Sequence, residues 1–403
     1  MTIGWTGAQY SLARVLLGTF VAVQAWSAVD ESTAMLVGAA LATVLALLLA
    51  IGWHDRIAAI ALLPLVGYHI WQKTQGMTAW AGPALHDFVG PGVTALLLVA
   101  HACQLPRPYG AWSMRGRPDP GGGWRIRPGV FAGLWTVMAL GYTAAGVTML
   151  AAPSQAWRMG DALGDMARQE GWRVVTPQLF SAATWTVLAL HLAYAPLALV
   201  RRLRPWIWTA MVVVNIGLAL AFTGQVFRAE LLMLHVFTFN PAWIPPLPRR
   251  REEGPAWVTQ QQHPETIFYD GYCGLCHRWV RFALAEDPAG RAFQFAPLQS
   301  PAFERAVPAD RRAELPDSVI VMTEDRQLLS RSDAVAHIMR RLGGIWRLLG
   351  ALLAMLPRFI RDGGYNAVAR IRHRLFKKPS DACPMLPPDL RTRFVFESVE
   401  AGR

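Results

Sequence analysis

The chain has 403 residues, of which 53% are hydrophobic, and 39 Lys and Arg against 27 Asp and Glu give a formal net charge of +12. This composition excludes an intrinsically disordered or a collagen-like chain. The first 248 residues carry 15 basic and 9 acidic side chains, and the last 155 carry 24 and 18. The first part is therefore suited to a lipid environment and the second part to water. Much of the basic excess flanks apolar segments, where membrane topology explains it better than nucleic-acid binding does.

Several apolar stretches in the first part approach the roughly 20 residues that a membrane-spanning helix needs. We predict eight spans, over Tyr10–Trp26, Thr33–Trp53, Ile57–Trp71, Phe88–Leu105, Gly129–Ala151, Leu179–Val200, Trp206–Phe227 and Ala229–Ile244. The third and the last are short, so seven spans with a re-entrant end are an alternative. The first stretch has no basic start and no small-residue cleavage site, which argues against a signal peptide.

The basic residues between these stretches favour one orientation in the membrane. With the amino terminus inside, twelve Arg residues fall in cytoplasmic loops and five Lys or Arg fall in the opposite loops. Cytoplasmic loops of membrane proteins carry such an excess. We therefore predict a multi-pass protein of the cell membrane, with residues 1–247 in the lipid bilayer and the carboxy-terminal region in the cytoplasm.

Polar side chains at membrane depth are costly, and those of this chain are candidates for function. They are Arg14, His69, His86, Asp87, His101, His191, Asn215, Glu230 and His235. Histidines on facing helices could hold haem or a metal, but no spacing here supports either. Hydrogen bonds within the helix bundle explain the same residues. We predict no cofactor and no metal ion.

Residues 8 to 247 resemble the horizontally transferred transmembrane family, to which the vitamin K-dependent gamma-carboxylase is related. The resemblance is carried by Arg14, Trp157–Leu163, Trp185, Pro196 before Arg201 and Arg202, and His235 before Phe239 and Trp243. Carboxylase-like members tend to carry a lysine shortly before the Trp-x-x-Gly segment, where this chain has Ala-Ala-Pro-Ser-Gln. The resemblance implies a membrane domain, and carboxylation is not carried over.

A proline- and arginine-rich segment separates the apolar part from the rest. The segment contains Pro241, Pro245, Pro246 and Pro248, followed by three arginines and two glutamates. These residues cannot continue a helix and predict an exposed linker over residues 248–264. We place a second domain at residues 265–390 and a tail at 391–403.

The second domain begins in the order strand, Cys-x-x-Cys, helix. Thr266–Tyr269 is β-branched or aromatic, Asp270–Gly271 signals a turn, and a helical pattern starts near Gly274. Further strands are predicted at Phe293–Phe295, Ser318–Met322 and Leu328–Ser330, and a helix capped by Ser332–Asp333 at Ala334–Leu342. The predicted fold class is thus a multi-pass α-helical membrane domain followed by an α/β thioredoxin-like domain.

The position of the cysteine pair suggests its chemistry. Cys273 stands just ahead of a predicted helix, whose amide groups and macrodipole stabilise a thiolate and lower its pKa. We therefore predict Cys273 as the nucleophile. Cys276, one turn further along and expected to be more buried, would resolve a mixed disulfide. Asp270 is a candidate for moving a proton, although the turn that it makes is the favoured explanation for this residue.

Three other readings of Cys-Gly-Leu-Cys-His remain open. Covalent haem attachment is suggested by His277 directly after Cys276, but the predicted cytoplasmic side lacks the usual maturation. A structural zinc site would need Cys383 and a fourth ligand such as His277, and no second Cys-x-x-Cys exists. The pair could also be structural. The preceding strand and the following helix favour the redox pair.

Residues 265–390 resemble the DCC-type thiol-disulfide oxidoreductase family, a thioredoxin-like group. The matching residues are Tyr269–Cys276, Asp317–Val319, Arg331–Ala334, Pro357–Arg358, Tyr365 and Cys383–Pro384. The resemblance implies a redox role for Cys273 and Cys276. We expect the substrate to be a protein or a low-molecular-weight thiol or disulfide.

Two positions depart from ordinary thioredoxins. Ser318 stands where a cis-proline normally faces the active-site disulfide, with Pro316 two residues earlier. Ser332–Asp333 occupies a place that helps to hold glutathione in glutaredoxins, but a helix cap alone explains the pair and is favoured. Cys383 could exchange with the active pair or be a small buried residue.

The apolar stretch Ile345–Leu356 is too short to span a membrane, and a basic run follows it. It would either lie on the inner leaflet or pack on the domain core.

The sequence thus favours a membrane-anchored thiol-disulfide oxidoreductase that uses Cys273 and Cys276. The alternative is a membrane protein that binds or moves a lipid or another hydrophobic ligand, with a redox-sensing soluble domain.

Overall fold

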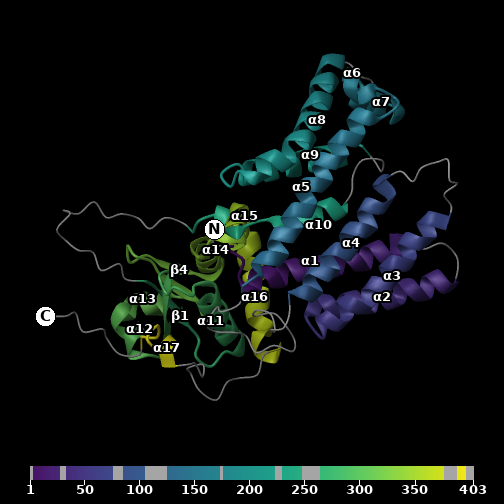
Figure 1. Ribbon diagram of the computed structural model, residues 1–403. Coiled ribbons are helices and arrows are strands. Elements are labelled where there is room, and N and C mark those ends of the chain that lie inside the picture. The colour runs from purple at the N-terminus through teal and green to yellow at the C-terminus, as the bar shows by residue number, and fades with distance from the viewer. Residues whose placement is uncertain are drawn as a thin grey trace. The chain divides into compact units, whose positions relative to one another are not determined.

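The computed structural model describes residues 3–27, 33–75, 85–104, 125–172, 176–222, 229–246, 264–375 and 388–395. The chain divides into two compact units (Figure 1). One consists of Ala13–Pro106 and Ile126–Phe239, and the other joins Met1–Leu12 and Arg107–Arg125 to Asn240–Arg403. Residues 247–263, which hold most of the predicted linker, and Cys383 lie outside the described residues.

The regular secondary structure described in the amino-terminal region consists of helices. Its helices are α1 (Gly7–Ser27), α2 (Thr33–Ile51), α3 (Asp55–Gln75), α4 (Leu85–Cys103), α5 (Pro128–Ala151), α6 (Ala156–Met159), α7 (Ala162–Gln169), α8 (Pro177–Leu199), α9 (Arg204–Ala221) and α10 (Ala229–Thr238). Proline occupies the first turn of α5, α8 and α9, where its missing N–H has no intrahelical partner to lose.

Among these helices α5, α8 and α9 are long and apolar enough to cross a membrane. Met35–Ile51 and Pro91–Cys103 are shorter apolar segments. The prediction of eight spans is therefore supported only in coarser form, as a helical region with a few apolar helices. The last predicted span is interrupted because Pro241 cannot continue α10. Instead Asn240 caps a 3-10 turn, η1 (Pro241–Trp243), by accepting the Ala242 N–H.

The carboxy-terminal region contains a small mixed sheet. Its strands are β1 (Glu265–Tyr269), β2 (Phe293–Pro297), β3 (Ile320–Met322) and β4 (Leu328–Ser330), in the order β2-β1-β3-β4. β1 runs parallel to β2 and antiparallel to β3, and β3 pairs antiparallel with β4. A parallel pair needs a crossover, and α11 (Gly274–Glu286) supplies it between β1 and β2. The four predicted strands are confirmed.

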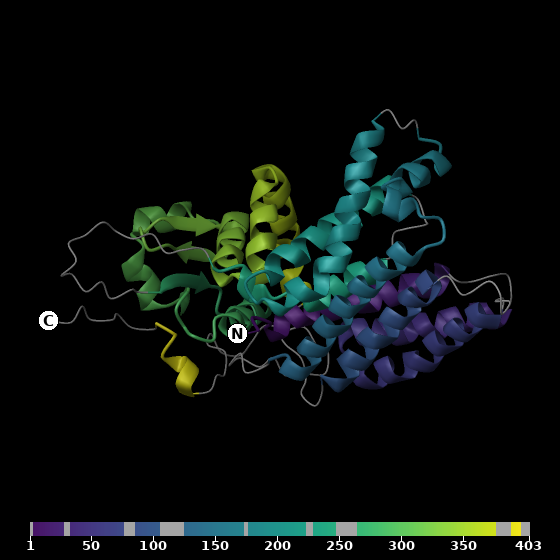
Figure 2. The ribbon, with the colours of Figure 1, turned by 45° about the horizontal axis from the view of Figure 1, so that its top comes forward.

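Helices complete the domain, and α11, α12 and α14 contact the strands. They are α11, α12 (Pro301–Ala306), α13 (Ala309–Glu314), α14 (Arg331–Leu342), α15 (Gly344–Met355), α16 (Arg358–Leu375) and α17 (Pro388–Arg391). Figure 2 shows α14 to α16 as the yellow-green helices beside the green sheet.

The core of this domain lies on both faces of β1. On one face Ile267 and Tyr269 pack with Val280 of α11 and Ile338 of α14. On the other, Phe268 packs with residues of α12 and β3. Alternation along the strand sends successive side chains to opposite faces, and both faces are covered, so β1 is buried along its whole length.

The described end of the chain also joins this core. Phe394 stacks on Phe295, with the ring centroids 5.4 Å apart, and the Val395 N–H donates to the Phe295 carbonyl at 2.8 Å. Arg393 bonds the Asp287 carboxylate at 2.7 Å. Residues 391–395, which the sequence places in a tail, therefore pack along β2.

The predicted cap of α14 is wrong. The helix begins at Arg331, so Ser332 and Asp333 lie inside its first turn, and Ser330 holds the cap position without a side-chain bond. Arg331 has a φ of 52°, and its N–H donates to Ser318 Oγ at 3.3 Å. This bond to the residue ahead of β3 starts the helix early.

The other end of α11 carries a buried carboxylate. Thr6 Oγ1 and Trp346 Nε1 each donate to Glu286 Oε2 at 2.5 Å, and Ala8 packs with Phe282 and Trp346. Burial raises the pKa of Glu286. The first residues of the chain are therefore packed into the carboxy-terminal unit.

Removing the Phe295 ring tests the core. Phe295→Ala should lower the free energy of unfolding of the carboxy-terminal unit by roughly 3 to 5 kcal/mol, because it leaves a cavity in a close-packed core. The urea dependence of proteolysis within residues 264–375 measures it in the full chain in detergent. The exposed Phe359→Ala is the matched control, and equal losses in both variants would contradict the assignment of the core.

Candidate functional site

Cys273 occupies the N-cap position of α11, directly after the turn that leaves β1. Its backbone is extended, and its Sγ accepts the Cys276 N–H at 3.2 Å. This is the bond that orphan amides at a helix start make with a capping side chain. The Cys276 amide in the first turn of α11 therefore points toward the Cys273 sulfur.

The relative burial of the two cysteines is the reverse of the sequence expectation. Cys273 is 1% exposed, and Cys276 is partly exposed. The cap bond explains the difference, since it turns the Cys273 sulfur back over the first turn of the helix. Both sulfurs are free thiols in this structure.

The surroundings lower the pKa of the Cys273 thiol and raise that of the Cys276 thiol. The bond from the Cys276 side chain, the Cys276 amide and the nearby Arg372 charge lower the pKa of Cys273 to about 6, against the opposing effects of burial and Asp270. The Cys273 partner and burial raise the pKa of Cys276. At neutral pH Cys273 is the thiolate and Cys276 keeps its proton.

Helix α16 contributes two residues that the sequence reasoning did not place at the site. Arg372 is 5% exposed, and its guanidinium lies 2.7 Å from the Asp317 carboxylate and 4.0 Å from that of Asp270. Tyr365 Oη accepts the Val319 N–H at 3.1 Å, and burial raises the pKa of Tyr365. They stand seven residues apart, about two helical turns, so they share one face of α16.

Asp270 and His277 hold the loop around the cysteines. Asp270 Oδ1 accepts the Tyr272 N–H and the Gln299 side-chain N–H, both at 3.0 Å. His277 Nε2 lies 2.7 Å from the Gly271 carbonyl, and a carbonyl only accepts, so this nitrogen donates. Both contacts fix the turn before α11.

The Ser332–Asp333 pair is engaged within the domain. Ser332 Oγ donates to Asp362, and Arg361 donates to Asp333 at 2.5 Å and to Ser332 Oγ at 3.0 Å. Arg358 bonds the other Asp333 oxygen at 2.7 Å. These arginines come from the basic run that follows Ile345–Leu356, so part of that run is paired inside the domain.

Ser318, at the predicted departure from thioredoxins, lies just ahead of β3. Its Oγ donates to the Val319 carbonyl at 3.2 Å and accepts the Arg331 N–H. The described backbone has no cis peptide bond.

The polar residues of the helical region gather in two clusters. Arg14 and His101 approach Asp55 Oδ2 at 3.6 and 3.4 Å, and all three are buried. Gly52, at φ 72°, lies so close that a Cβ there would meet the Arg14 guanidinium at 2.6 Å. This cluster therefore requires glycine at position 52.

The second cluster surrounds Tyr142. Its hydroxyl accepts the Asn215 amide at 3.0 Å and lies 3.5 Å from His235 Nδ1, and its ring meets the His191 ring edge-on. His191 and His235 also contact backbone carbonyls of their own helices. Among the described residues, no group of three or more His, Cys, Asp or Glu could hold a metal.

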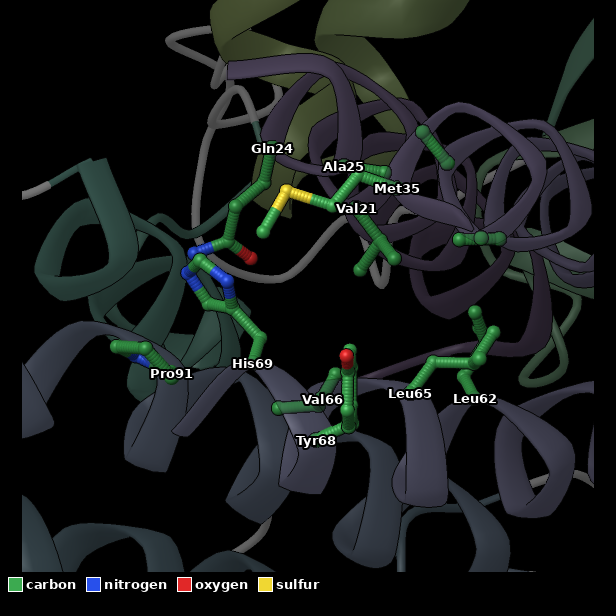
Figure 3. Close-up of a pocket in the computed structure, with 13 residues that line it drawn as sticks. Val21, Gln24, Ala25, Met35, Leu62, Leu65, Val66, Tyr68, His69 and Pro91 are labelled. Carbon is green, nitrogen blue, oxygen red and sulfur yellow. The ribbon is translucent and has the colours of Figure 1, made fainter. Parts of the chain in front are cut away.

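A cavity between α1, α2, α3 and α4 has His69 in its wall. It has a volume of about 110 Å³ and is lined mainly by apolar side chains, with Gln24 and His69 facing it (Figure 3). Gln24 donates to Glu230 at 2.7 Å and accepts from Thr94 at 3.0 Å. The side chains of His86 and Asp87 lie outside the described residues.

The cysteine pair lies at the start of α11, which Cys273 caps, and beside a small mixed sheet. This arrangement is typical of a thiol-disulfide oxidoreductase-like domain. The profile of the DCC1-like thiol-disulfide oxidoreductases matches residues 267–378. The chain is 33% identical to the uncharacterized protein YuxK of Bacillus subtilis over 144 residues, 34% of this chain and 99% of that protein. It is 31% identical to the chloroplastic DCC family protein At1g52590 of Arabidopsis thaliana over 134 residues, 33% of this chain and 76% of that protein.

The chain belongs, through its carboxy-terminal domain, to the DCC1-like thiol-disulfide oxidoreductase family. No solved structure matches it. The profile match lies in the carboxy-terminal domain, and the resemblance of the helical region to the gamma-carboxylase-like family stays a prediction.

The acidity of Cys273 can be measured directly. Only the thiolate is alkylated, so the rate of iodoacetamide labelling at Cys273 should rise as the pH increases through about 6 and level off near neutral pH. Peptide mapping by mass spectrometry assigns the label to Cys273. A midpoint near 9, the ordinary value for a thiol, would contradict the site geometry.

Arg372 should contribute to that acidity through its charge. Arg372→Gln removes the positive charge beside the sulfur and should move the midpoint of Cys273 labelling to higher pH, whereas Arg372→Lys should move it less. Arg370→Gln, at an exposed position of the same helix, is the matched control. Equal midpoints in wild type and Arg372→Gln would exclude Arg372 from the site.

Proposed function

We propose that the protein is a membrane-anchored thiol-disulfide oxidoreductase that exchanges disulfides through Cys273 and Cys276. The observation that carries this proposal is the Cys273 sulfur held against the Cys276 amide at the start of α11, with its pKa lowered to about 6. The strand order β2-β1-β3-β4, with one parallel pair and an antiparallel hairpin, supports a thioredoxin-like fold.

The two thiols would act in sequence. The Cys273 thiolate attacks one sulfur of a substrate disulfide, forms a mixed disulfide with it and releases the other sulfur as a thiolate, which takes up a proton. Cys276 then loses its proton and attacks Cys273 Sγ, which releases the second substrate thiolate and leaves a Cys273–Cys276 disulfide. Two electrons pass to the substrate. The raised pKa of Cys276 keeps it protonated until the first step has consumed the Cys273 charge.

Membrane anchoring is supported by the apolar helices α5, α8 and α9. The excess of arginine in alternate loops favours a cytoplasmic carboxy-terminal domain, and hence a substrate on that side, either a protein or a low-molecular-weight thiol or disulfide.

The cavity in the helical region favours a second candidate function. A space of about 110 Å³ between apolar side chains, with Gln24 and His69 at its wall, suits an apolar group of a hydrophobic ligand. The protein would then bind or move such a ligand, and the cysteine pair would sense redox state. Ligand uptake that Cys273→Ser leaves unchanged would favour this function.

Substitution of each cysteine separates the two roles. Cys273→Ser should abolish disulfide exchange, because it removes the nucleophile. Cys276→Ser should accumulate mixed disulfides, because nothing resolves them. Nonreducing electrophoresis of the full chain with a disulfide substrate measures both, and Cys103→Ser, an exposed cysteine of α4, should behave as wild type.

The exchange assignment would be excluded by activity that survives Cys273→Ser. A redox titration of the full chain in defined thiol buffers adds an independent check, since pairs in thioredoxin-like proteins titrate as two-electron couples between about −270 and −120 mV. If no Cys273–Cys276 disulfide forms across that range, the ligand-binding function is favoured instead.

A further inference from the structure

Helix α16 buries two of its arginines and exposes several of its large apolar side chains. Arg361 and Arg372 are largely buried against the carboxy-terminal domain, where both pair with carboxylates. Ile360, Val368 and Ile371 of the same helix are exposed. Helices on the surface of a soluble domain normally expose charged side chains and bury apolar ones, so these exposed apolar side chains indicate a surface that is covered by a partner.

The junction of α15 and α16 extends this apolar surface. Met355 and Phe359, on either side of Pro357, are 79% and 77% exposed. The set of large apolar side chains exposed on the two helices, here called the α15–α16 face, is Leu348, Leu352, Met355, Leu356, Phe359, Ile360, Val368 and Ile371. The buried side of α15 holds Trp346 and Gly350 instead, so this helix is apolar on both sides.

The segment that carries the α15–α16 face is basic in sequence, since residues 340–378 contain ten Lys or Arg and one acidic residue, Asp362. Arg341, Arg361 and Arg372 are largely buried in ion pairs within the domain, whereas Arg340, Arg347, Arg358 and Arg370 are exposed or partly exposed. Asp362 is already engaged by Ser332 and lies 3.8 Å from Arg358. An apolar surface within a basic segment fits a bilayer surface that bears anionic headgroups. A second copy of the chain fits poorly, because pairing through this face would bring the two sets of like charges together.

We propose that the α15–α16 face lies in the interface of an anionic lipid bilayer, with Met355 and Phe359 among the inserted side chains. This inference rests on the proposed membrane anchoring and deepens the proposed function. Helix α16 also carries Tyr365 and Arg372, which belong to the cysteine site, so a single helix connects that site to the α15–α16 face. The favoured substrates are then disulfides held at the membrane surface.

A photoreactive probe tests the contact in the full chain. Benzoylphenylalanine introduced at position 359 should give a lipid adduct, seen as a mass shift, after irradiation in vesicles of phosphatidylglycerol and phosphatidylcholine. The same probe at position 313, exposed on α13, should give none. A probe at position 140, exposed on α5, reports whether the helical region itself contacts lipid.

The outcomes separate this inference from the proposed function. A lipid adduct at position 140 without one at position 359 would overturn the inference and leave the anchoring intact. A crosslink from position 359 to protein, whether to this chain, a second copy or another partner, would also overturn it. An absence of lipid adducts at both positions would reject the anchoring and the inference together, while the cysteine chemistry is tested by its own assay.

A charge placed on the α15–α16 face gives a second readout. Phe359→Glu should reduce exchange with a disulfide peptide tethered to the vesicle and leave exchange with the same peptide in solution unchanged. Ala313→Glu is the matched control. Equal loss on both peptides would indicate damage to the domain and contradict a role in membrane contact.

Discussion

The hydrogen bond from the Cys276 amide to the Cys273 sulfur is the contact on which the carboxy-terminal domain depends for its chemistry. It exists because β1 ends in a turn held by Asp270, which delivers Cys273 to the first turn of α11. The same contact accounts for the burial of Cys273 and, together with Arg372, for its acidity. The sheet and its helices therefore serve to keep one sulfur in front of one helix end.

The order of helices and strands near the cysteines could be predicted because it depends on local sequence patterns. The β-branched and aromatic run at Thr266–Tyr269, the Asp270–Gly271 turn and the helical spacing from Gly274 are each decided by a few neighbouring residues. The cap at Ser332 was mispredicted for the opposite reason. A bond between Arg331 and the distant Ser318 starts α14 earlier, and the Ser332 hydroxyl goes to Asp362 instead. Tertiary contacts therefore outweigh the local preference of Ser332 for a cap position.

Arg372 and Tyr365 could not be placed at the site from the sequence, since about a hundred residues separate them from Cys273. Arg372 belongs to a basic run, for which the sequence leaves both a lipid-facing surface and packing on the domain core open. One signal was available: Tyr365 and Arg372 are seven residues apart and would share a helix face. In the helical region the polar residues within apolar stretches could be recognised from the sequence, but the residues that they contact could not. The contact of Arg14 with Asp55, for example, joins separate helices.

The Glu286 carboxylate, at the opposite end of α11 from the cysteines, has a consequence for how the domain can be isolated. Thr6 and Ala8 belong to its surroundings, so a fragment that starts after the linker leaves Trp346 and Phe282 without part of their packing and removes one donor from a buried acid. Such a fragment is a different folding unit from the domain in the intact chain. A designed soluble version would have to carry the first dozen residues, fused or added as a peptide, to keep that end of the helix closed.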